Sequence, residues 1–595
     1  MKKFVDLVKN ESLKLWGQKS FRVLLIIFAV ILVLTPSLNA AFVSSLSNTA
    51  YDEPDPENYK QRAEDARAEG DELKAREYEV YYETELYFAE GGYYRSSVEY
   101  SLYYHSYLEL AMARSSLRLI SEGEYTVDML NGSYYSSLDE LYAFLTDFGF
   151  YDDMGENGYM QYNVLTIVNQ ALADRSAEEW IKSVESELAS VCFNIENFSM
   201  RSYYGQLKTF AQERISELKA SREESLKTFK NSNLPNEETD YHRALIDYFT
   251  DVIACYEAYE KGVDYLIVND CEYSSWEYNT AAGILYEVAS SAEYYVPLHR
   301  DDFSSGHYSY QYSDVEEYNE DMQNERLLAL EARDYSIYSL ENSIPMPVTL
   351  TETSTKATTV SQFRTFAGML AVLFICYGGI MMAHEYTSGT IRLLLIKPRT
   401  RRRILCSKLV CLVFWWVVLA TGAMLLLTLE NMLMLGVGDV FVPDLKATGK
   451  GIAEIPSFVS ALGVFGEELV IAMLYVAFAI LFAILTKKTA LAVVFPMLVS
   501  MGASTIQTVC IALYDVGATF LAYTPFFYLD FEFLHVTAPE CFAYDYSGSL
   551  LATVYATTNT VLGKHANIWI GIAMIAALTV LVALWALRAF KKQKI

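Results

Sequence analysis

The chain alternates between long apolar runs and one long polar stretch, so the two parts have to be read separately. Residues 44–362 are polar and acidic, and most other residues belong to apolar runs joined by short loops. A helix needs about 20 apolar residues to cross the hydrocarbon core of a bilayer. Six windows qualify: 23–43, 363–382, 404–429, 470–485, 490–513 and 568–587. The pattern predicts an all-α membrane protein with six transmembrane helices and a mostly helical extracytoplasmic domain between spans one and two.

The first window allows two interpretations, a cleavable signal peptide or a retained signal anchor. A polar segment of about 20 residues precedes it and no small-x-small cleavage site follows, which favours the anchor. Residues 1–22 also contain apolar positions near helical spacing among lysines, which is typical of a helix in the inner membrane interface. These positions are Phe4, Leu7, Val8, Leu15 and Trp16. A plain basic flank that only fixes topology explains the lysines equally well.

Lys and Arg are concentrated in four segments that fall on one side of a six-span protein. These are the N-terminus, the loop after span two, the turn at Lys487 and Lys488, and the C-terminus. The two shorter loops on the other side contain only Lys446, Lys450 and Lys564. Because cytoplasmic loops are enriched in Lys and Arg, both termini are predicted to be cytoplasmic and residues 44–362 extracytoplasmic. We expect a multi-pass protein of a bacterial plasma membrane.

The acidic segment is charged enough to suggest disorder, yet it is rich in aromatic residues. Residues 44–362 contain 60 Asp and Glu against 23 Lys and Arg, a net charge of −37, whereas the whole chain carries −28. They also contain 37 of the 46 tyrosines, too many for a solvated tail. Apolar residues recur at helical spacing over 207–229 and 241–263, and helices are also expected from about 57 to 120. Pro235 and Asn269–Asp270 mark the start and end of the second stripe.

The sequence offers no convincing catalytic, cofactor-binding or metal-binding site. Thr448 to Gly451 superficially resembles a phosphate-binding loop, but it lacks the upstream glycine and the Ser or Thr after the lysine. Two groups of side chains were weighed as cation sites; the first is better explained by chance clustering in so acidic a domain, and the second by an acidic turn. They are His299, Asp301, Asp302 and His307, and Asp152, Asp153, Glu156 and Asn157. A disulfide between Cys255 and Cys271 is compatible with the sequence but not indicated by it.

Three carboxylates lie close to the predicted membrane. Glu430, Glu467 and Glu468 fall at the outer ends of spans three and four. A carboxylate inside a membrane is a functional candidate, whereas one at the headgroup level costs little. We expect these three residues at the headgroup level.

The most informative segment follows span two on the cytoplasmic side. His384 and Glu385 are followed by a turn at Ser388–Thr390, a short apolar helix at 391–396, and Pro398, which ends it. Arginines and Lys408 come next. A short helix with apolar residues at the cytoplasmic face needs a partner, and an ordinary basic loop does not explain this order of residues.

This segment resembles the coupling region of type 2 ATP-binding-cassette transporter permeases. The family pattern has a Glu, a Gly-Thr pair, a Leu pair, a Pro, and Arg or Lys before span three. The matching residues here are Glu385, Gly389, Thr390, Leu394, Leu395, Pro398, Arg402 and Lys408. Lys9 to Lys14 is similar to the family's interfacial helix, and Thr524 to Leu529 to its Pro-Phe segment after span five. The resemblance covers the spans and short loops but not residues 44–362.

The resemblance implies a permease subunit without catalytic residues or cofactors of its own. A second permease subunit, identical or related, would complete the pathway among membrane lipids, and a separate cytosolic ATPase dimer would bind ATP and Mg²⁺ and dock on residues 385–408. The expected activity is export or extrusion of an amphipathic peptide or a lipid-like substrate, with no role for nucleic acid. The charge of the outer domain adds a cationic amphipathic peptide, for instance an antimicrobial one, as a candidate ligand. Two alternatives remain, a surface receptor or sensor, and a machine that moves its outer domain mechanically.

Overall fold

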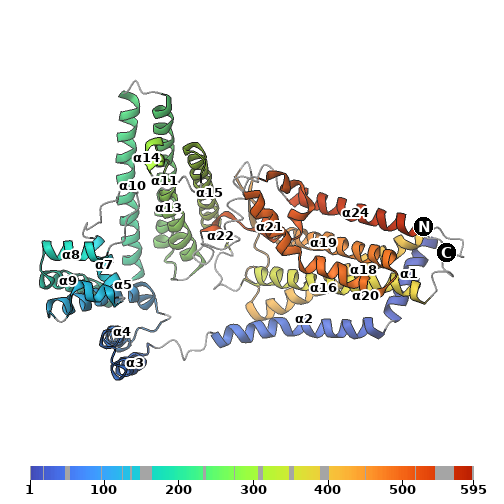
Figure 1. The fold of residues 1–595 in the computed structure, drawn as a ribbon, viewed down its shortest axis with the longest axis horizontal. Coiled ribbons are helices and arrows are strands. Elements are labelled where there is room, and N and C mark those ends of the chain that lie inside the picture. Colours follow the sequence, from blue (N-terminus) through green and yellow to red (C-terminus); the bar gives the residue numbers. More distant parts are fainter. Residues whose placement is uncertain are drawn as a thin grey trace.

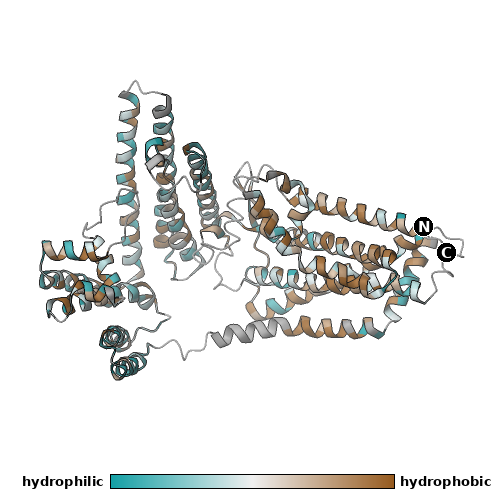
Figure 2. Cartoon of the chain, viewed as in Figure 1, coloured by the Kyte–Doolittle hydropathy of each residue, from teal (hydrophilic) through white to brown (hydrophobic). Residues whose placement is uncertain are grey.

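The computed structural model describes fifteen segments of the chain. They are residues 2–17, 19–46, 54–95, 97–123, 125–133, 137–147, 164–231, 236–273, 275–305, 312–346, 354–388, 401–448, 451–515, 518–542 and 568–592. These segments form a bundle of apolar helices with a group of more polar helices at one end (Figures 1 and 2). The expected fold class, an all-α membrane protein, is confirmed.

The membrane part contains the expected apolar helices. They are α2 (Lys19–Leu46), α16 (Thr355–Thr387), α18 (Arg401–Leu435), α19 (Ser457–Thr486), α20 (Thr489–Met501), α21 (Ala503–Asp515) and α24 (Ile568–Lys592). Among the described residues, α16, α18, α19 and α24 are each long and apolar enough to cross a membrane. Two bent pairs also pass this test, α20 with α21 at 40° and α1 (Lys2–Gly17) with α2 at 74°. The structure therefore contains four to six candidate spans, and the six windows of the sequence all fall on these helices.

Helix α16 lies at the centre of the bundle. It packs against α18, α19 and α20, and 72% of its apolar window is buried, against 28% for α18 and 22% for α24. Small residues allow this close packing, as is common between membrane helices. A Cβ atom on Gly379 would lie 3.1 Å from the carbonyl oxygen of Ala492 on α20. The outer surfaces of α18 and α24 remain largely uncovered.

The polar helices form two units in succession along the chain. The distal unit contains α3 (Pro56–Glu69), α4 (Glu72–Gly91), α5 (Val98–Ser121), α6 (Val127–Gly132), α7 (Ser137–Asp147), α8 (Val164–Asp174) and α9 (Ala177–Glu196). The proximal unit contains α10 (Met200–Asn231), α11 (Asn236–Asn269), α12 (Trp276–Tyr278), the π-helix η2 (Asn279–Ile284), α13 (Leu285–Tyr294), α14 (Arg300–Ser305) and α15 (Val315–Asn342). Each unit has apolar clusters of its own.

Tyrosines fill much of the distal core, and their hydroxyl groups stabilise a buried carboxylate. Glu85 is 1% exposed and accepts hydrogen bonds from the hydroxyls of Tyr100 and Tyr104 at 3.1 and 3.0 Å. Arg95 lies 3.3 Å from the same carboxylate and supplies the counter-charge. Phe88 makes ring contacts with both tyrosines. Many of the tyrosines of the acidic segment therefore have a structural role.

The two helices predicted from the stripes at 207–229 and 241–263 are α10 and α11. They are 32 and 34 residues long, about 48 and 51 Å, and pack side by side (Figure 1). Helix α11 ends at Asn269, as predicted, and the chain turns at Asp270, whose φ is +50°. The proposed start signal, Pro235, lies outside the described residues.

A short hairpin between α18 and α19 was not predicted from the sequence. Strands β1 (Asp444–Thr448) and β2 (Gly451–Ile455) pair antiparallel, with Thr448 opposite Gly451. Five residues per strand give only a weak alternating pattern, and apolar flanks on both sides obscure it. Of the segment that superficially resembles a phosphate-binding loop, Thr448 ends β1 and Gly451 begins β2, and the two residues between them lie outside the described residues.

The hairpin packs against the proximal unit. The Tyr335 hydroxyl of α15 accepts a hydrogen bond from the Ala447 amide at 2.5 Å, and the Tyr338 hydroxyl donates one to Glu454 at 3.0 Å. Leu445, Ala447 and Ile452 pack against the proximal core. This core therefore includes residues outside 44–362, although the composition changes at those boundaries.

Candidate functional site

Helices α1, α16 and α18 meet at the end of the bundle that carries both termini (Figure 1). Helix α1 contacts α18 and turns one face toward it, on which Glu11 and Leu15 are 4% and 1% exposed. Aromatic rings fix the turn from α1 into α2. Trp16 stacks on Trp415 of α18 at 5.5 Å between ring centroids, and Phe21 meets Trp415 edge-on. Of the two interpretations of the first 22 residues, the structure supports a packed helix.

A cluster of four charged side chains, Glu11, Lys14, Glu385 and Lys408, joins α1, α16 and α18. The Lys408 ammonium, only 1% exposed, lies 2.7 Å from Glu385 Oε1 and 2.9 Å from Glu11 Oε2. Lys14 lies 2.8 Å from Glu11 Oε1 and 3.9 Å from Glu385 Oε1, at the solvent side. Two ammonium groups thus face two carboxylates, and this charge cluster is neutral. Loss of one partner would leave an uncompensated buried charge.

The cluster favours the charged form of the two side chains that α1 contributes. Burial works against ionisation of Glu11, but the ammonium groups of Lys408 and Lys14 outweigh it and lower the pKa of this carboxyl. Burial likewise disfavours the Lys14 ammonium, but its hydrogen bond to Glu11 raises the pKa above the ordinary value. Both side chains therefore remain ionised around neutral pH.

Three of the eight residues predicted for this site are described. Glu385 and Lys408 lie in direct contact, and Arg402 lies exposed in the first turn of α18. Gly389, Thr390, Leu394, Leu395 and Pro398 lie outside the described residues. The second carboxylate oxygen of Glu385 is buried and has no hydrogen-bond partner within the described segments.

Glu11 belongs to this cluster, although it was not predicted as a site residue from the sequence. It lies on the same face of α1 as Val8 and Leu15, at helical spacing. A charged residue on an apolar helix face signals a buried counter-charge, and this signal was available in the sequence. Its partner Lys408 is 397 residues away and could not be identified from spacing.

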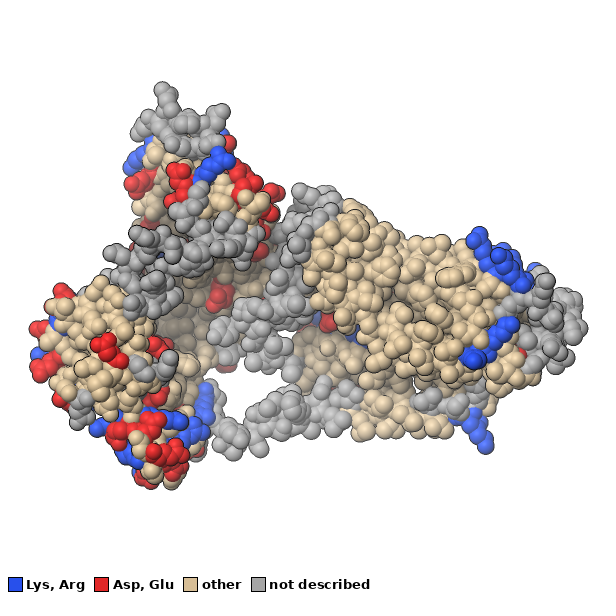
Figure 3. Space-filling model, viewed as in Figure 1, with Lys and Arg blue, Asp and Glu red and all other residues tan. Residues whose placement is uncertain are grey.

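Arg401 ties the start of α18 to the last span. Its Nη1 donates to the carbonyl oxygens of Phe590 and Lys591, at 3.2 and 2.8 Å. The same end of the bundle thus joins α1, α16, α18 and α24. Lys and Arg also gather at this end on the face seen in Figure 3, whereas most visible Asp and Glu lie on the polar helices.

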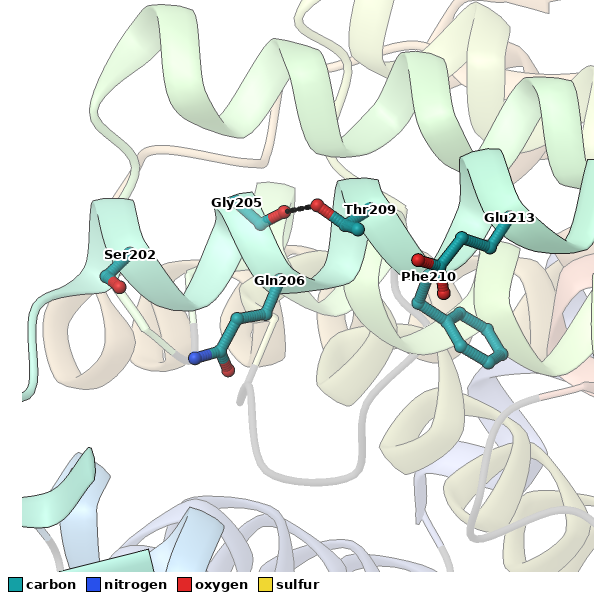
Figure 4. A pocket seen from close by; sticks show the side chains of 6 residues that line it. All are labelled: Ser202, Gly205, Gln206, Thr209, Phe210 and Glu213. Carbon is teal, nitrogen blue, oxygen red and sulfur yellow. Dashed lines mark hydrogen bonds between the residues drawn. The ribbon is translucent and has the colours of Figure 1, made fainter. Parts of the chain in front are cut away.

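A pocket elsewhere has the character of an open surface. It has a volume of about 590 Å³ and lies along one face of α10 (Figure 4). Its lining residues are Ser202, Gly205, Gln206, Thr209, Phe210 and Glu213. Within the described segments, no group of three or more His, Cys, Asp or Glu side chains is arranged to hold a metal ion. All eight cysteines are free, so no bond joins Cys255 to Cys271.

Replacement of Lys408 should test how the charge cluster supports the fold. Lys408→Met leaves two buried carboxylates without their main counter-charge, and we expect a loss of about 3–5 kcal/mol in the free energy of unfolding. The measurement is the thermal unfolding midpoint of the purified chain in detergent. The triple variant with Glu11→Gln and Glu385→Gln should recover most of the loss. Lys9→Met, at an exposed position of α1, serves as the control, and an equally small effect of Lys408→Met would contradict the interpretation.

Comparison with known proteins identifies the family. The family profile described as ABC-2 family transporter protein matches residues 7–595, nearly the whole chain. Searches of curated proteins and of solved structures gave no match. The apolar helices and the match together establish a multi-pass membrane protein of the permease type. The chain therefore belongs to the ABC-2 family of transporter proteins.

Proposed function

We propose that this chain is the permease subunit of an exporter driven by a separate cytosolic ABC ATPase, and that the charge cluster receives the motion of that ATPase. Membership of the ABC-2 family supports an ATPase partner in general terms. The single observation that carries the proposal is the buried contact of Lys408 with Glu11 and Glu385. ATP and Mg²⁺ bind to the partner, and this chain contributes no catalytic residue.

The charge cluster is well placed to transmit a force. Residues 389–400, which the resemblance assigns to ATPase docking, connect α16 to α18, and Glu385 and Lys408 lie on either side of that segment. Separating a buried ammonium from its carboxylates is costly, so the ends of α1, α16 and α18 move together when one of them is displaced. A push on the docking segment therefore reaches three helices at once.

Several observations favour an orientation with both termini in the cytoplasm. Helix α1 and the end of α24 lie at the same end of the bundle, and the polar helices lie at the other (Figure 1). The basic residues at the end near the termini agree with the positive-inside rule (Figure 3). A second permease subunit, identical or related, would cover the exposed sides of α18 or α24.

Single introduced cysteines test this orientation. Asn342→Cys and Lys488→Cys both lie at exposed positions, at the end of α15 and just beyond α19 respectively. In intact cells, a membrane-impermeant thiol reagent should label the first at least tenfold more than the second, after subtraction of the parental chain with its eight native cysteines. Equal labelling of both positions would contradict the orientation.

Removal of charge from Glu385 tests coupling. Glu385→Gln keeps the shape of the side chain but weakens its hold on Lys408, so we expect substrate-stimulated ATP hydrolysis to fall about tenfold while insertion and co-purification of the ATPase persist. Asp6→Asn, on the exposed face of α1, is the matched control. Full stimulation in Glu385→Gln would exclude this cluster from coupling, and absence of any ATPase partner would favour the receptor alternative.

We further propose an amphipathic substrate, either a cationic peptide or a lipid-like molecule. The charge of −37 over residues 44–362 attracts cations and speeds their association at low salt. The α10 face adds an exposed apolar ring next to a carboxylate, because Phe210 is 42% exposed and Glu213 lines the same hollow (Figure 4). The competing explanation is that the charge only keeps the domain soluble. The half-buried tyrosines that bond to Glu85 fit that explanation better.

Peptide titration separates these explanations. The full chain is needed, because the proximal core includes residues from the membrane part. Cationic amphipathic peptides should bind saturably at about 50 mM salt and more weakly at about 300 mM, with a remaining preference for apolar sequence. Phe210→Ser should reduce the apolar part of binding, and Phe193→Ser, an exposed ring on α9, is the control. Binding that is independent of peptide sequence and is lost at the higher salt concentration would indicate only nonspecific electrostatic attraction.

A further inference from the structure

One short segment after span five belongs to two hydrophobic cores. This bridge segment, residues 525–542, contains the 3-10 helices η5 (Pro525–Tyr528) and η6 (Glu532–His535) and the helix α22 (Ala538–Cys541). Its first part is buried in the core of the membrane helices, and its last part in the core of the proximal unit. Only a few residues separate the part that lies in the membrane core from the part that lies in the proximal core.

The membrane end of the bridge segment is tightly held. Phe527, Tyr528 and Phe531 are fully buried. A Cβ atom on Gly571 of α24 would lie 2.5 Å from the ring of Tyr528 and 2.6 Å from that of Phe531, so α24 packs directly on both rings. Gln507 of α21 donates a hydrogen bond to the Asp530 carbonyl oxygen at 2.9 Å. A movement of α21 or α24 would therefore displace this end of the bridge segment.

The outer end is equally well fixed to the proximal unit. Ala538 and Phe542 are 0% and 7% exposed and join the same apolar cluster as Leu340 of α15. Thr537 and Glu540 form a capping box at the start of α22, which holds this short helix in shape. Helix α15 also contacts the β1–β2 hairpin, so the outer helices rest on two supports that arise from the membrane part.

A hydrogen bond between a half-exposed histidine and a buried carboxylate lies where the bridge segment passes between the cores. His535 Nε2 is 2.9 Å from both carboxylate oxygens of Glu467 on α19, which is 1% exposed. Arg364 of α16 approaches the same carboxylate at 3.4 Å and Glu468 at 3.5 Å. The sequence had suggested that Glu467 and Glu468 lie at the lipid headgroups. The structure encloses Glu467 in protein, because α16 and the bridge segment supply its partners, and its depth in the membrane stays a prediction.

We propose that the bridge segment couples movement of the membrane helices to the outer helical domain, with the His535–Glu467 contact as its joint. The proposal rests on the proposed function, since an ATPase must first move the spans. It extends that function, because the outer domain becomes a moving part of the transport cycle. Glu467 suits such a role, since an ionisable side chain buried among spans is costly and marks a functional position.

The experiment is hydrogen–deuterium exchange on the full chain with its co-purified ATPase, nucleotide-free and trapped with ATP and vanadate. In the wild type, trapping should change the exchange of α15 and of the β1–β2 hairpin. His535→Ala should reduce that change at least threefold, while ATPase binding and basal hydrolysis remain within twofold. His535→Gln keeps a hydrogen-bond donor and should retain most of the response. Glu532→Gln, at an exposed position of the same segment, is the control and should behave as the wild type.

A second variant allows the proposal to be tested even if His535→Ala misfolds. Phe542→Ala removes the outer anchor without touching Glu467, and it should also reduce the response of α15. A wild-type complex that hydrolyses ATP without any change in α15 or the hairpin would overturn the proposal, as would a full response in both variants. Failure of the ATPase to co-purify would instead contradict the proposed function, so the two failures are distinguishable.

Discussion

A buried ammonium group needs its counter-charge inside the protein, and much of the structure at the end of the bundle that carries both termini follows from that need. Lys408 is held by one carboxylate from α16 and one from α1. The contact with Glu11 requires α1 to lie against α18 instead of continuing the direction of α2, and the chain bends by 74° between them. Trp16 and Phe21 complete the turn on Trp415. The position of α1 is thus fixed by charge and aromatic packing together.

Each end of the membrane bundle contains a buried charged side chain whose partners come from other elements of the structure. At the end that carries both termini, a buried lysine contacts two carboxylates, and at the opposite end a buried carboxylate contacts an arginine and a histidine. In both places α16 supplies one of the groups, Glu385 near one end and Arg364 near the other. Since α16 is also more enclosed than α18, α19 and α24, it connects the two charged centres through the middle of the protein.

Periodicity and length were sufficient to predict the spans, the α10–α11 pair and the helical class of the outer domain, since these depend on local residue order. Glu385 and Lys408 were both named through the family resemblance, but their contact was not predicted. Contacts between residues that lie far apart in the sequence could not be predicted from periodicity, length or resemblance. Glu11 and Lys408 are 397 residues apart, and Glu467 and His535 are 68 apart. The shared proximal core escaped prediction for the same reason, because Ala538 and Phe542 lie far from 44–362 in the sequence.

The shared core also has a consequence for biosynthesis. Helix α15 ends at Asn342, and the ribosome must add almost 200 further residues before Ala538 and Phe542 exist. At about 5–20 residues per second, that interval is roughly 10–40 s. During this time the proximal unit, already synthesised, exposes the apolar surface that α22 and the hairpin later cover. A nascent chain of this kind depends on protection outside the membrane until its last spans are inserted, and truncation before residue 538 leaves that surface permanently open.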